Sequence, residues 1–374
     1  MKSRERWEYL ARAPKIVWDA TVRGRHEFLF DWMPIVVRGM SRRQRLNLLR
    51  AGLNLGYRRL LPWGWPLHVQ VELTSYCDLE CPVCPVGTGQ LQRGAKAMDV
   101  DLYQRLMKEV GPYLLTASLW AWGEPLLHPR LDRILAITSR YPLASLLSTN
   151  GQILNQPRVQ KALREQPPAY LIVAIDGLCD QTNAVYRKGA RLRPALEGVR
   201  ALAEWKRRTG APRPVLHCRF MAMKHNEHEL PRLEQFALEH GFDMVSVRSL
   251  SVIDSSEEAH RSLIPASKLL RAYHYENGQR LRRDDFVCQH AFTFPSVLAD
   301  GTVVACEQDF NGLHAYGVFS GQHSFASIWF GKQAAAIREA IVTAPEQFSF
   351  CRNCPYAGRE SSSCSLYGHA LRPD

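Results

Sequence analysis

The sequence predicts an α/β protein whose parallel sheet curves into a partial (β/α)6 barrel. Strand-like and helix-like patterns alternate at regular spacing over residues 67–275. Six βα units in series place helices on the outer face of a parallel sheet. No G-x-G-x-x-G turn and no Walker loop occurs in the chain, which argues against a dinucleotide- or nucleotide-binding sheet.

Each unit is a short apolar run followed by a segment with helical periodicity. The predicted strands cover residues 68–75, 114–121, 144–149, 170–175, 214–222 and 243–249. The predicted helices cover residues 99–110, 130–140, 155–164, 191–209, 228–240 and 265–275. Barrels of this kind carry their chemistry at the C-terminal ends of the strands, so the residues that follow each strand are the first candidates for a site.

The chain divides into three predicted parts. Residues 67–250 form the barrel, 251–374 form a small C-terminal domain with fewer helical signals, and 1–66 form a helical extension. Among the 374 residues, 46% are hydrophobic, as in a globular protein. Because no run approaches the roughly 18 to 20 apolar residues of a membrane span and no signal peptide is present, we expect a cytoplasmic location.

Cysteine spacing carries most of the functional information. Cys77, Cys81 and Cys84 form a C-x3-C-x2-C pattern directly after the first strand. Ten cysteines in a large intracellular protein indicate metal binding or catalysis more than a disulfide framework. Three thiolates on one loop can hold three irons of a [4Fe–4S] cluster and leave the fourth iron open. Structural zinc or unliganded thiols are the alternative, although no histidine or fourth cysteine lies nearby in the sequence.

The loop with Cys77, Cys81 and Cys84 resembles the signature of radical S-adenosylmethionine (SAM) enzymes. The resemblance implies that SAM chelates the open iron. It also implies that an electron from a flavodoxin or ferredoxin cleaves SAM to a 5′-deoxyadenosyl radical. The sequence departs from the family at Val83, where an aromatic residue is usual, and this puts a packing contact from that side chain to adenine in doubt.

Later strand ends extend the resemblance in the family's order. The segments are Trp122–Pro125, Ser148–Gly151, Ile175–Gly177, Tyr186–Gly189 and Met223–Glu227. The resemblance implies that SAM is bound by Gly123, Glu124, Ser148, Asn150, Asp176 and Arg187. Taken singly, these segments are also common turns, so their order carries the argument.

A second group of cysteines lies in the C-terminal part. Cys288, Gly301 and Cys306 follow the spacing C-x12-G-x4-C, and Cys351-x2-Cys354 supplies a second pair. Four thiolates saturate a [4Fe–4S] cluster, and tetrahedral zinc is the alternative. The spacing resembles the SPASM and shorter twitch domains, which implies one auxiliary [4Fe–4S] cluster.

The overall layout is similar to the twitch-containing cyclitol dehydrogenases. A full SPASM domain has seven such cysteines, whereas this region adds only Cys364 to the four. Cys364 is therefore a spare or alternate ligand.

Substrate chemistry is harder to assign from the sequence. Cys218, within the fifth strand, is a candidate hydrogen-atom donor if it faces the barrel lumen, and core packing is the alternative for it and for Cys179. Three polar residues near the barrel mouth are candidate acids or bases for the substrate: Glu72, Lys224 and Arg248.

The N-terminal extension carries +9 of the formal net charge of +12. Seven arginines and no acid lie between Arg38 and Arg59. Apolar residues recur there at helical spacing: Leu46, Leu49, Leu53 and Tyr57. A basic amphipathic helix is typical of contact with the anionic inner face of a membrane. Packing against the open side of the barrel is an equal alternative, and nucleic-acid binding ranks third.

The leading expectation is therefore hydrogen abstraction from a small molecule, sugar or lipid headgroup, with oxidation or rearrangement of that substrate. Modification of a ribosomal peptide or protein is the alternative. It ranks lower because peptide-modifying relatives often carry a strand-rich N-terminal domain, whereas residues 1–66 show no convincing strand pair. A zinc-bearing binding protein on a degenerate barrel is the non-enzymatic alternative.

Overall fold

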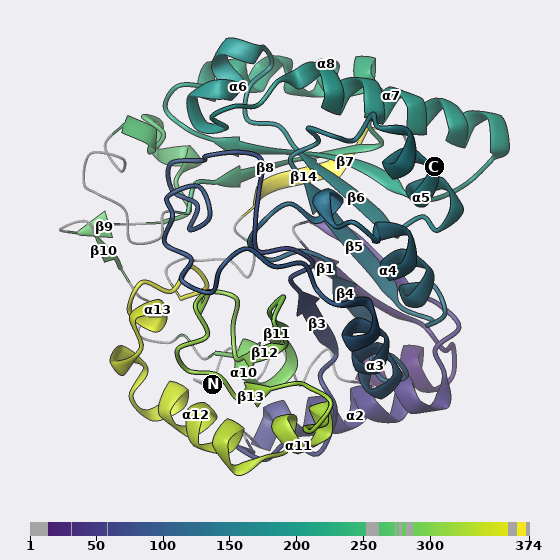
Figure 1. Cartoon of the computed structure of the whole chain (residues 1–374), viewed down its shortest axis with the longest axis vertical. Coiled ribbons are helices and arrows are strands. Elements are labelled where there is room, and N and C mark those ends of the chain that lie inside the picture. The colour runs from purple at the N-terminus through teal and green to yellow at the C-terminus, as the bar shows by residue number, and fades with distance from the viewer. Residues whose placement is uncertain are drawn as a thin grey trace.

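A ten-stranded sheet organises the protein, in the order β13-β12-β11-β3-β4-β5-β6-β7-β8-β14 (Figure 1). The structure is a computed structural model that describes residues 14–30, 32–57, 59–251, 262–273, 275–276, 279–281, 286, 288–357 and 365–371. Its central strands are parallel. They are β3 (His68–Val71), β4 (Thr116–Ser118), β5 (Ala144–Thr149), β6 (Tyr170–Ala174), β7 (Val215–Ala222) and β8 (Met244–Ser249).

Helices follow these strands and lie along the outer side of the curved sheet (Figure 1). They are α3 (Val100–Val110), α4 (Leu131–Thr138), α5 (Pro157–Glu165), α6 (Asp180–Tyr186), α7 (Leu192–Thr209) and α8 (Leu233–His240), with turns η1 (Pro125–Leu127) and η2 (Glu227–Arg232). Apolar residues of strands and helices form one large core between them. The predicted partial barrel is confirmed.

The C-terminal part adds strands to both ends of the barrel sheet. β11 (Ser296–Val297) pairs with β3, and β14 (Ser365–Ala370) pairs with β8. β12 (Thr302–Val304) and β13 (Gly317–Val318) continue the sheet beyond β11. Around them lie α10 (His290–Thr293), α11 (Phe325–Trp329), α12 (Lys332–Thr343), η4 (Pro345–Gln347), α13 (Ser349–Arg352) and a short hairpin of β9 (Tyr275–Glu276) and β10 (Gln279–Arg280). Residues after 250 therefore share a sheet with the barrel.

The N-terminal part contains a strand pair that the sequence analysis did not predict. After a helical stretch that ends at residue 21, β1 (His26–Phe30) pairs antiparallel with β2 (Met33–Val37), and α2 (Arg42–Tyr57) follows. The hairpin turns at Trp32, whose φ of 65° lies in the left-handed region that non-glycine residues rarely adopt. The expectation of a purely helical extension without strand pairs was wrong.

This N-terminal part closes the end of the barrel opposite the cysteine loop. Ile35 and Met40 pack in one buried cluster with residues at the starts of strands, including Ala144 and Met244. On α2, the Gln44 amide donates hydrogen bonds to the carbonyl oxygens of Leu114 (2.6 Å) and Pro142 (2.7 Å). The predicted packing of this segment against the barrel is therefore observed.

One predicted helix is absent. Within residues 265–275 the described chain forms only the short turn η3 (Lys268–Leu270), and β9 begins at Tyr275. Arg271 already has extended backbone angles, and Tyr273 is buried beneath the guanidinium of Arg280 at 4.5 Å. Tertiary packing of Tyr273 outweighs the weak helical pattern here.

Arg338 of α12 joins the C-terminal part to the segment before β3. Its guanidinium is fully buried and donates hydrogen bonds to the carbonyl oxygens of Ala291 (2.9 Å), Leu60 (3.0 Å) and Trp329 (2.9 Å). It also lies over the Trp329 ring, 4.3 Å from the centroid. One side chain therefore satisfies three carbonyl groups from separate elements.

We expect Arg338→Met to lower the free energy of unfolding by about 3 kcal/mol, because it leaves buried carbonyl groups without donors. Arg338→Lys, which keeps one charged donor, should cost less. Thermal unfolding followed by tryptophan fluorescence measures both effects. An unchanged unfolding temperature for Arg338→Met would show that these contacts do not stabilise the fold.

Candidate active site

The predicted core-cluster ligands lie on one loop at the C-terminal end of β3. Within it, the Cys84 N–H donates to the Cys81 carbonyl oxygen at 3.2 Å, which closes a tight turn. The Glu80 N–H donates to the Lys188 carbonyl oxygen at 3.2 Å, so the loop after β6 supports the cysteine loop. Cys77, Cys81 and Cys84 are all free thiols in one small cluster of buried side chains.

The chemistry of these thiols is compatible with a metal centre. Burial raises the pKa of Cys77 to about 12 and that of Cys81 to about 11. Both groups are therefore neutral at pH 7 unless positive charge is present beside them, and a metal centre supplies that charge. Three thiols on one loop suit a [4Fe–4S] cluster with one iron left for SAM.

The Glu124 carboxylate ties the loop after β4 to the loop after β5. It is fully buried and accepts hydrogen bonds from Thr149 Oγ1 (2.6 Å) and from the N–H groups of Asn150 (2.8 Å) and Leu126 (3.0 Å). Burial raises the pKa of Glu124 to about 7, and the hydrogen bonds oppose that rise. The carboxylate therefore fixes the relative position of these two loops.

Gly123 allows the same loop to approach the cysteine loop. Its φ is 102°, and a Cβ at this position would lie 2.3 Å from the Thr74 carbonyl oxygen. Thr74 Oγ1 donates to the Glu124 carbonyl oxygen (2.8 Å), and the Glu124 N–H donates to the Tyr76 carbonyl oxygen (2.9 Å). Glycine is therefore required at position 123 by both space and backbone angle.

The other predicted SAM ligands surround this region. Ser148 is half-buried in β5, and Asn150 directly follows that strand. Arg187 Nε lies 2.8 Å from Asp176 Oδ2 in a largely buried ion pair. Asp176 also accepts the Met221 N–H at 2.7 Å, which anchors the pair to β7. Contact of these residues with SAM stays a prediction.

Glu72 has partners that the sequence did not reveal. Its carboxylate is completely buried, contacts Arg93 Nη2 at 2.8 Å and accepts the Ala299 N–H at 2.9 Å. Burial raises the pKa of Glu72, and Arg93 counters that rise. Both carboxylate oxygens therefore hold neighbouring segments together, so we assign Glu72 a structural role in place of the predicted acid–base role.

Cys218 faces the helices and not the barrel lumen. It is fully buried in the main core, and its partners in the neighbouring strands, Val173 and Val245, belong to the same core. The residues on either side, His217 and Arg219, therefore point to the opposite face of the sheet. The condition for a hydrogen-atom donor is not met, and the packing alternative fits this position.

The remaining two catalytic candidates lie on neighbouring parts of the barrel. Lys224 is exposed directly after β7, and Arg248 is half-buried on β8, where it pairs in register with Ser365 of β14. Their roles toward a substrate stay predictions.

The C-terminal cysteines come together around a buried site. Burial raises the pKa of Cys306 well above its ordinary value, and Cys354 and Cys288 lie near enough to add to the rise. Cys351 is buried on α13, one turn before Cys354. Cys364 lies outside the described residues. Cys288 and Cys354 near Cys306, with Cys351 one turn before Cys354, fit the predicted auxiliary [4Fe–4S] cluster.

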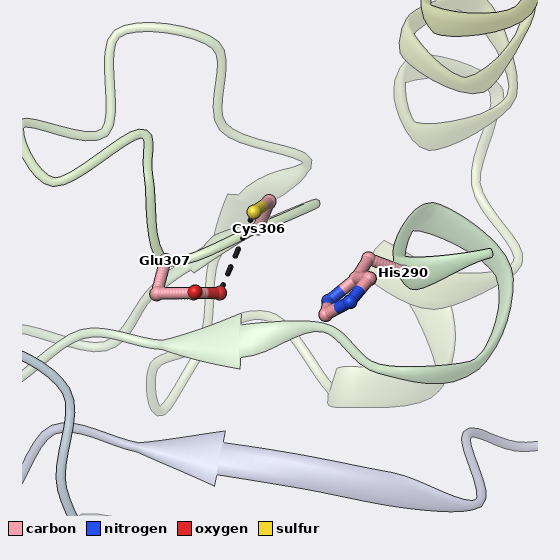
Figure 2. A group of neighbouring side chains, drawn as sticks. All are labelled: His290, Cys306 and Glu307. Carbon is pink, nitrogen blue, oxygen red and sulfur yellow. Dashed lines mark hydrogen bonds between the residues drawn. The ribbon is translucent and has the colours of Figure 1, made fainter. Parts of the chain in front are cut away.

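Two further side chains point into this site (Figure 2). Potential ligand atoms of His290, Cys306 and Glu307 all lie within 4.8 Å of one another. Glu307 Oε2 accepts a hydrogen bond from Cys306 Sγ at 3.4 Å, and Glu307 Oε1 accepts one from the Tyr356 hydroxyl. The sequence analysis missed His290 and Glu307, although each lies within two residues of a predicted cysteine ligand.

Hydrogen bonds connect the two cysteine sites directly. Trp122, next to Gly123, donates from Nε1 to the Glu307 carbonyl oxygen at 2.6 Å. Arg93, nine residues after Cys84, donates from Nε to the Phe310 carbonyl oxygen at 2.6 Å. The loops at the two sites are therefore held in fixed relation. These contacts join residues that are far apart in the chain, so no local sequence pattern predicts them.

We expect the two sites to lose iron independently. The reconstituted wild-type chain should bind about eight irons, and serine replacements of Cys351 and Cys354 together should leave about four. That variant should still cleave SAM, whereas replacing Cys77, Cys81 and Cys84 should abolish cleavage. Iron analysis and chromatography of 5′-deoxyadenosine measure these outcomes.

Cys179→Ser, which changes an exposed thiol beside Thr182, is the matched control and should keep all iron. Full iron content in the Cys351/Cys354 variant would overturn the auxiliary ligand set.

Comparisons with known proteins agree with this geometry. Residues 71–236 match the model of the radical SAM superfamily, and residues 288–355 match that of the SPASM iron–sulfur cluster-binding domain. A PqqA peptide cyclase of Xanthomonas campestris is 24% identical over 335 residues, which cover 83% of this chain and 84% of the relative.

A tungsten-containing aldehyde ferredoxin oxidoreductase cofactor-modifying protein of Pyrococcus furiosus is 25% identical over 185 residues, or 49% of this chain. That match spans about half the length of the relative (51%). Among solved structures, Streptococcus suis SuiB bound to SAM aligns with a TM-score of 0.59 at 15% identity, over 79% of this chain and 72% of SuiB, which supports the fold. The chain belongs to the radical SAM superfamily, with a C-terminal SPASM domain, and is an enzyme that uses SAM and [4Fe–4S] clusters.

Proposed function

We propose that this enzyme modifies a peptide or protein substrate by abstracting a hydrogen atom from it. The observation that carries the proposal is the alignment with PqqA peptide cyclases, which covers more than four fifths of each chain. The small-molecule substrate that the sequence analysis ranked first has no comparable support among these relatives.

The N-terminal hairpin supports the same proposal. The sequence analysis ranked peptides lower because it expected no strand pair in residues 1–66, and β1 with β2 removes that argument. Within the described residues the hairpin forms a sheet of its own, so β1 has an edge that is not part of a larger sheet. Such an edge can bind an extended peptide by adding a strand, as many peptide-recognition domains do.

The chain's residues provide what this reaction needs. Bound SAM and the core cluster supply the 5′-deoxyadenosyl radical, and a flavodoxin- or ferredoxin-type protein donates the electron. Abstraction breaks one substrate C–H bond and forms the C–H bond of 5′-deoxyadenosine. The buried Glu124 network and the Asp176–Arg187 pair hold the surrounding loops. Cys288, Cys306, Cys351 and Cys354 would hold an auxiliary cluster, and that cluster would supply an acceptor for the electron that a substrate radical loses on oxidation.

Deuterium transfer tests the substrate class. Peptides that are encoded next to the gene for this enzyme are synthesised with deuterated side chains. They are then incubated with the reconstituted enzyme, SAM and a reductant. We expect deuterium in 5′-deoxyadenosine and a peptide that has lost a pair of hydrogen atoms, both read by mass spectrometry.

The Cys77→Ser variant, which lacks a core ligand, is the negative control. Deuterium transfer from a cyclitol or a lipid headgroup, with none from any peptide, would refute the peptide proposal.

We also propose that the exposed face of α2 contacts an anionic membrane. Three apolar side chains of this helix are exposed: Leu46 (48%), Leu53 (53%) and Tyr57 (72%). Exposed arginines adjoin them at positions 42, 43 and 50, and Arg59 lies over the exposed Trp63 ring at 4.7 Å. Apolar and cationic groups on one face suit an anionic interface, where each basic charge contributes roughly 1 kcal/mol. Among the described residues, no helix is both long and apolar enough to span a bilayer.

Vesicle sedimentation tests this second proposal. The full chain should bind vesicles that contain anionic phospholipid, and Leu53→Glu should weaken binding at least about tenfold through lost apolar burial and added repulsion. Arg130→Glu, at the exposed residue directly before α4, is a surface control and should change binding little. Equal binding to neutral and anionic vesicles would contradict the proposal.

A further inference from the structure

The side-chain amide of Asn150 contacts both a cluster ligand and a carboxylate, which are themselves in contact, since Cys77 Sγ lies 3.7 Å from Asp78 Oδ1. Asn150 Nδ2 is 2.7 Å from Asp78 Oδ1 and 3.5 Å from Cys77 Sγ. Cys77 is one of the three predicted ligands of the core cluster, and Asp78 is the next residue in the chain. One amide group therefore donates toward a sulfur and toward an acid beside that sulfur.

The orientation of this amide is fixed from several sides. Asn150 Oδ1 accepts the Gln152 N–H at 3.0 Å, so Nδ2 is the atom that faces Cys77. The backbone N–H of Asn150 donates to Glu124 at 2.8 Å, and Asn150 is itself buried. The amide is therefore preorganised before any cofactor binds.

Hydrogen bonds to a ligating sulfur act on the reduction potential of an iron–sulfur cluster. Reduction adds negative charge to the cluster and its thiolates. A donor to Cys77 Sγ stabilises that added charge, as does the Leu79 N–H, which lies 3.4 Å from the same sulfur. The Asp78 carboxylate has the opposite effect, since negative charge beside the sulfur disfavours reduction.

We propose that Asn150 is a positioning residue that sets the potential of the core cluster, by donating to Cys77 Sγ and to the Asp78 carboxylate beside that sulfur. This role is independent of the substrate and goes beyond the contact with SAM predicted from the sequence. It assigns opposite effects to two adjacent side chains, because one donates to the sulfur and the other repels its charge.

An EPR-monitored redox titration of the anaerobically reconstituted full chain tests this proposal. The core signal is identified as the one that SAM perturbs, and its midpoint is measured without SAM. Asn150→Ala should make reduction roughly tenfold less favourable, a shift of about 59 mV to more negative potential for one electron. Asp78→Asn should shift the midpoint in the positive direction, by less, because Asp78 is exposed and water screens its charge.

Asn155→Ala is the matched control, because Asn155 lies five residues further along and pairs with the exposed Glu197 at 2.9 Å. Its midpoint should equal that of the wild type. Iron content confirms that each variant holds its clusters. If Asn150→Ala loses the core cluster, the direction of the midpoint shift in Asp78→Asn tests the proposal by itself. Unchanged midpoints, or shifts of the two variants in the same direction, would overturn the proposal.

Discussion

The active site depends on one buried carboxylate, that of Glu124. Its oxygens accept hydrogen bonds from Thr149 and Asn150, while its backbone exchanges hydrogen bonds with Thr74 and Tyr76. Three strand ends, those of β3, β4 and β5, are thereby held at one place. The cysteine loop, the Gly123 turn and the Asn150 amide all take their positions from this arrangement. A buried acid with a full set of donors is costly to move, which makes these loops a rigid platform.

The second constraint is the connection between the two cysteine sites. Arg93 contacts Glu72, directly after β3, and the Phe310 carbonyl oxygen in the C-terminal part, and Trp122 contacts the Glu307 carbonyl oxygen. β11 also pairs directly with β3. The C-terminal part is therefore joined to the barrel at β3, the strand that precedes the core cysteines. A substrate held between the two sites would meet fixed distances to both.

Much of the barrel could be predicted because its signals are local. Buried parallel strands are short apolar runs, and the six predicted strands overlap β3 to β8. The hairpin of β1 and β2 lacked such signals: its turn uses Trp32 with a positive φ in place of Asn-Gly or Asp-Gly, and Pro34 interrupts the second strand. The helix predicted at residues 265–275 does not form, although a local signal for it is present. The periodic pattern there is weak, and the packing of the buried Tyr273 outweighs it.

The site residues also divide into those that local sequence patterns predict and those that depend on long-range contacts. Cysteine spacing is visible in the sequence, so the two iron–sulfur domains could be predicted from it, whereas the orientation of Cys218 toward the helices needed the register of β7. The pairing of Glu72 with Arg93 joins residues 21 positions apart and could not be read from a local motif. Long-range hydrogen bonds thus determine which polar side chains stabilise the fold and which are available to bind a substrate or cofactor.

The central claim is that one cluster site has an open iron for SAM and that the other is saturated by four thiolates. EPR spectra of the anaerobically reduced protein, recorded with and without SAM, test it most directly. The account predicts two cluster signals, of which SAM changes one and leaves the other unaltered. A spectrum with two signals that SAM does not affect, or with a single signal, would contradict it.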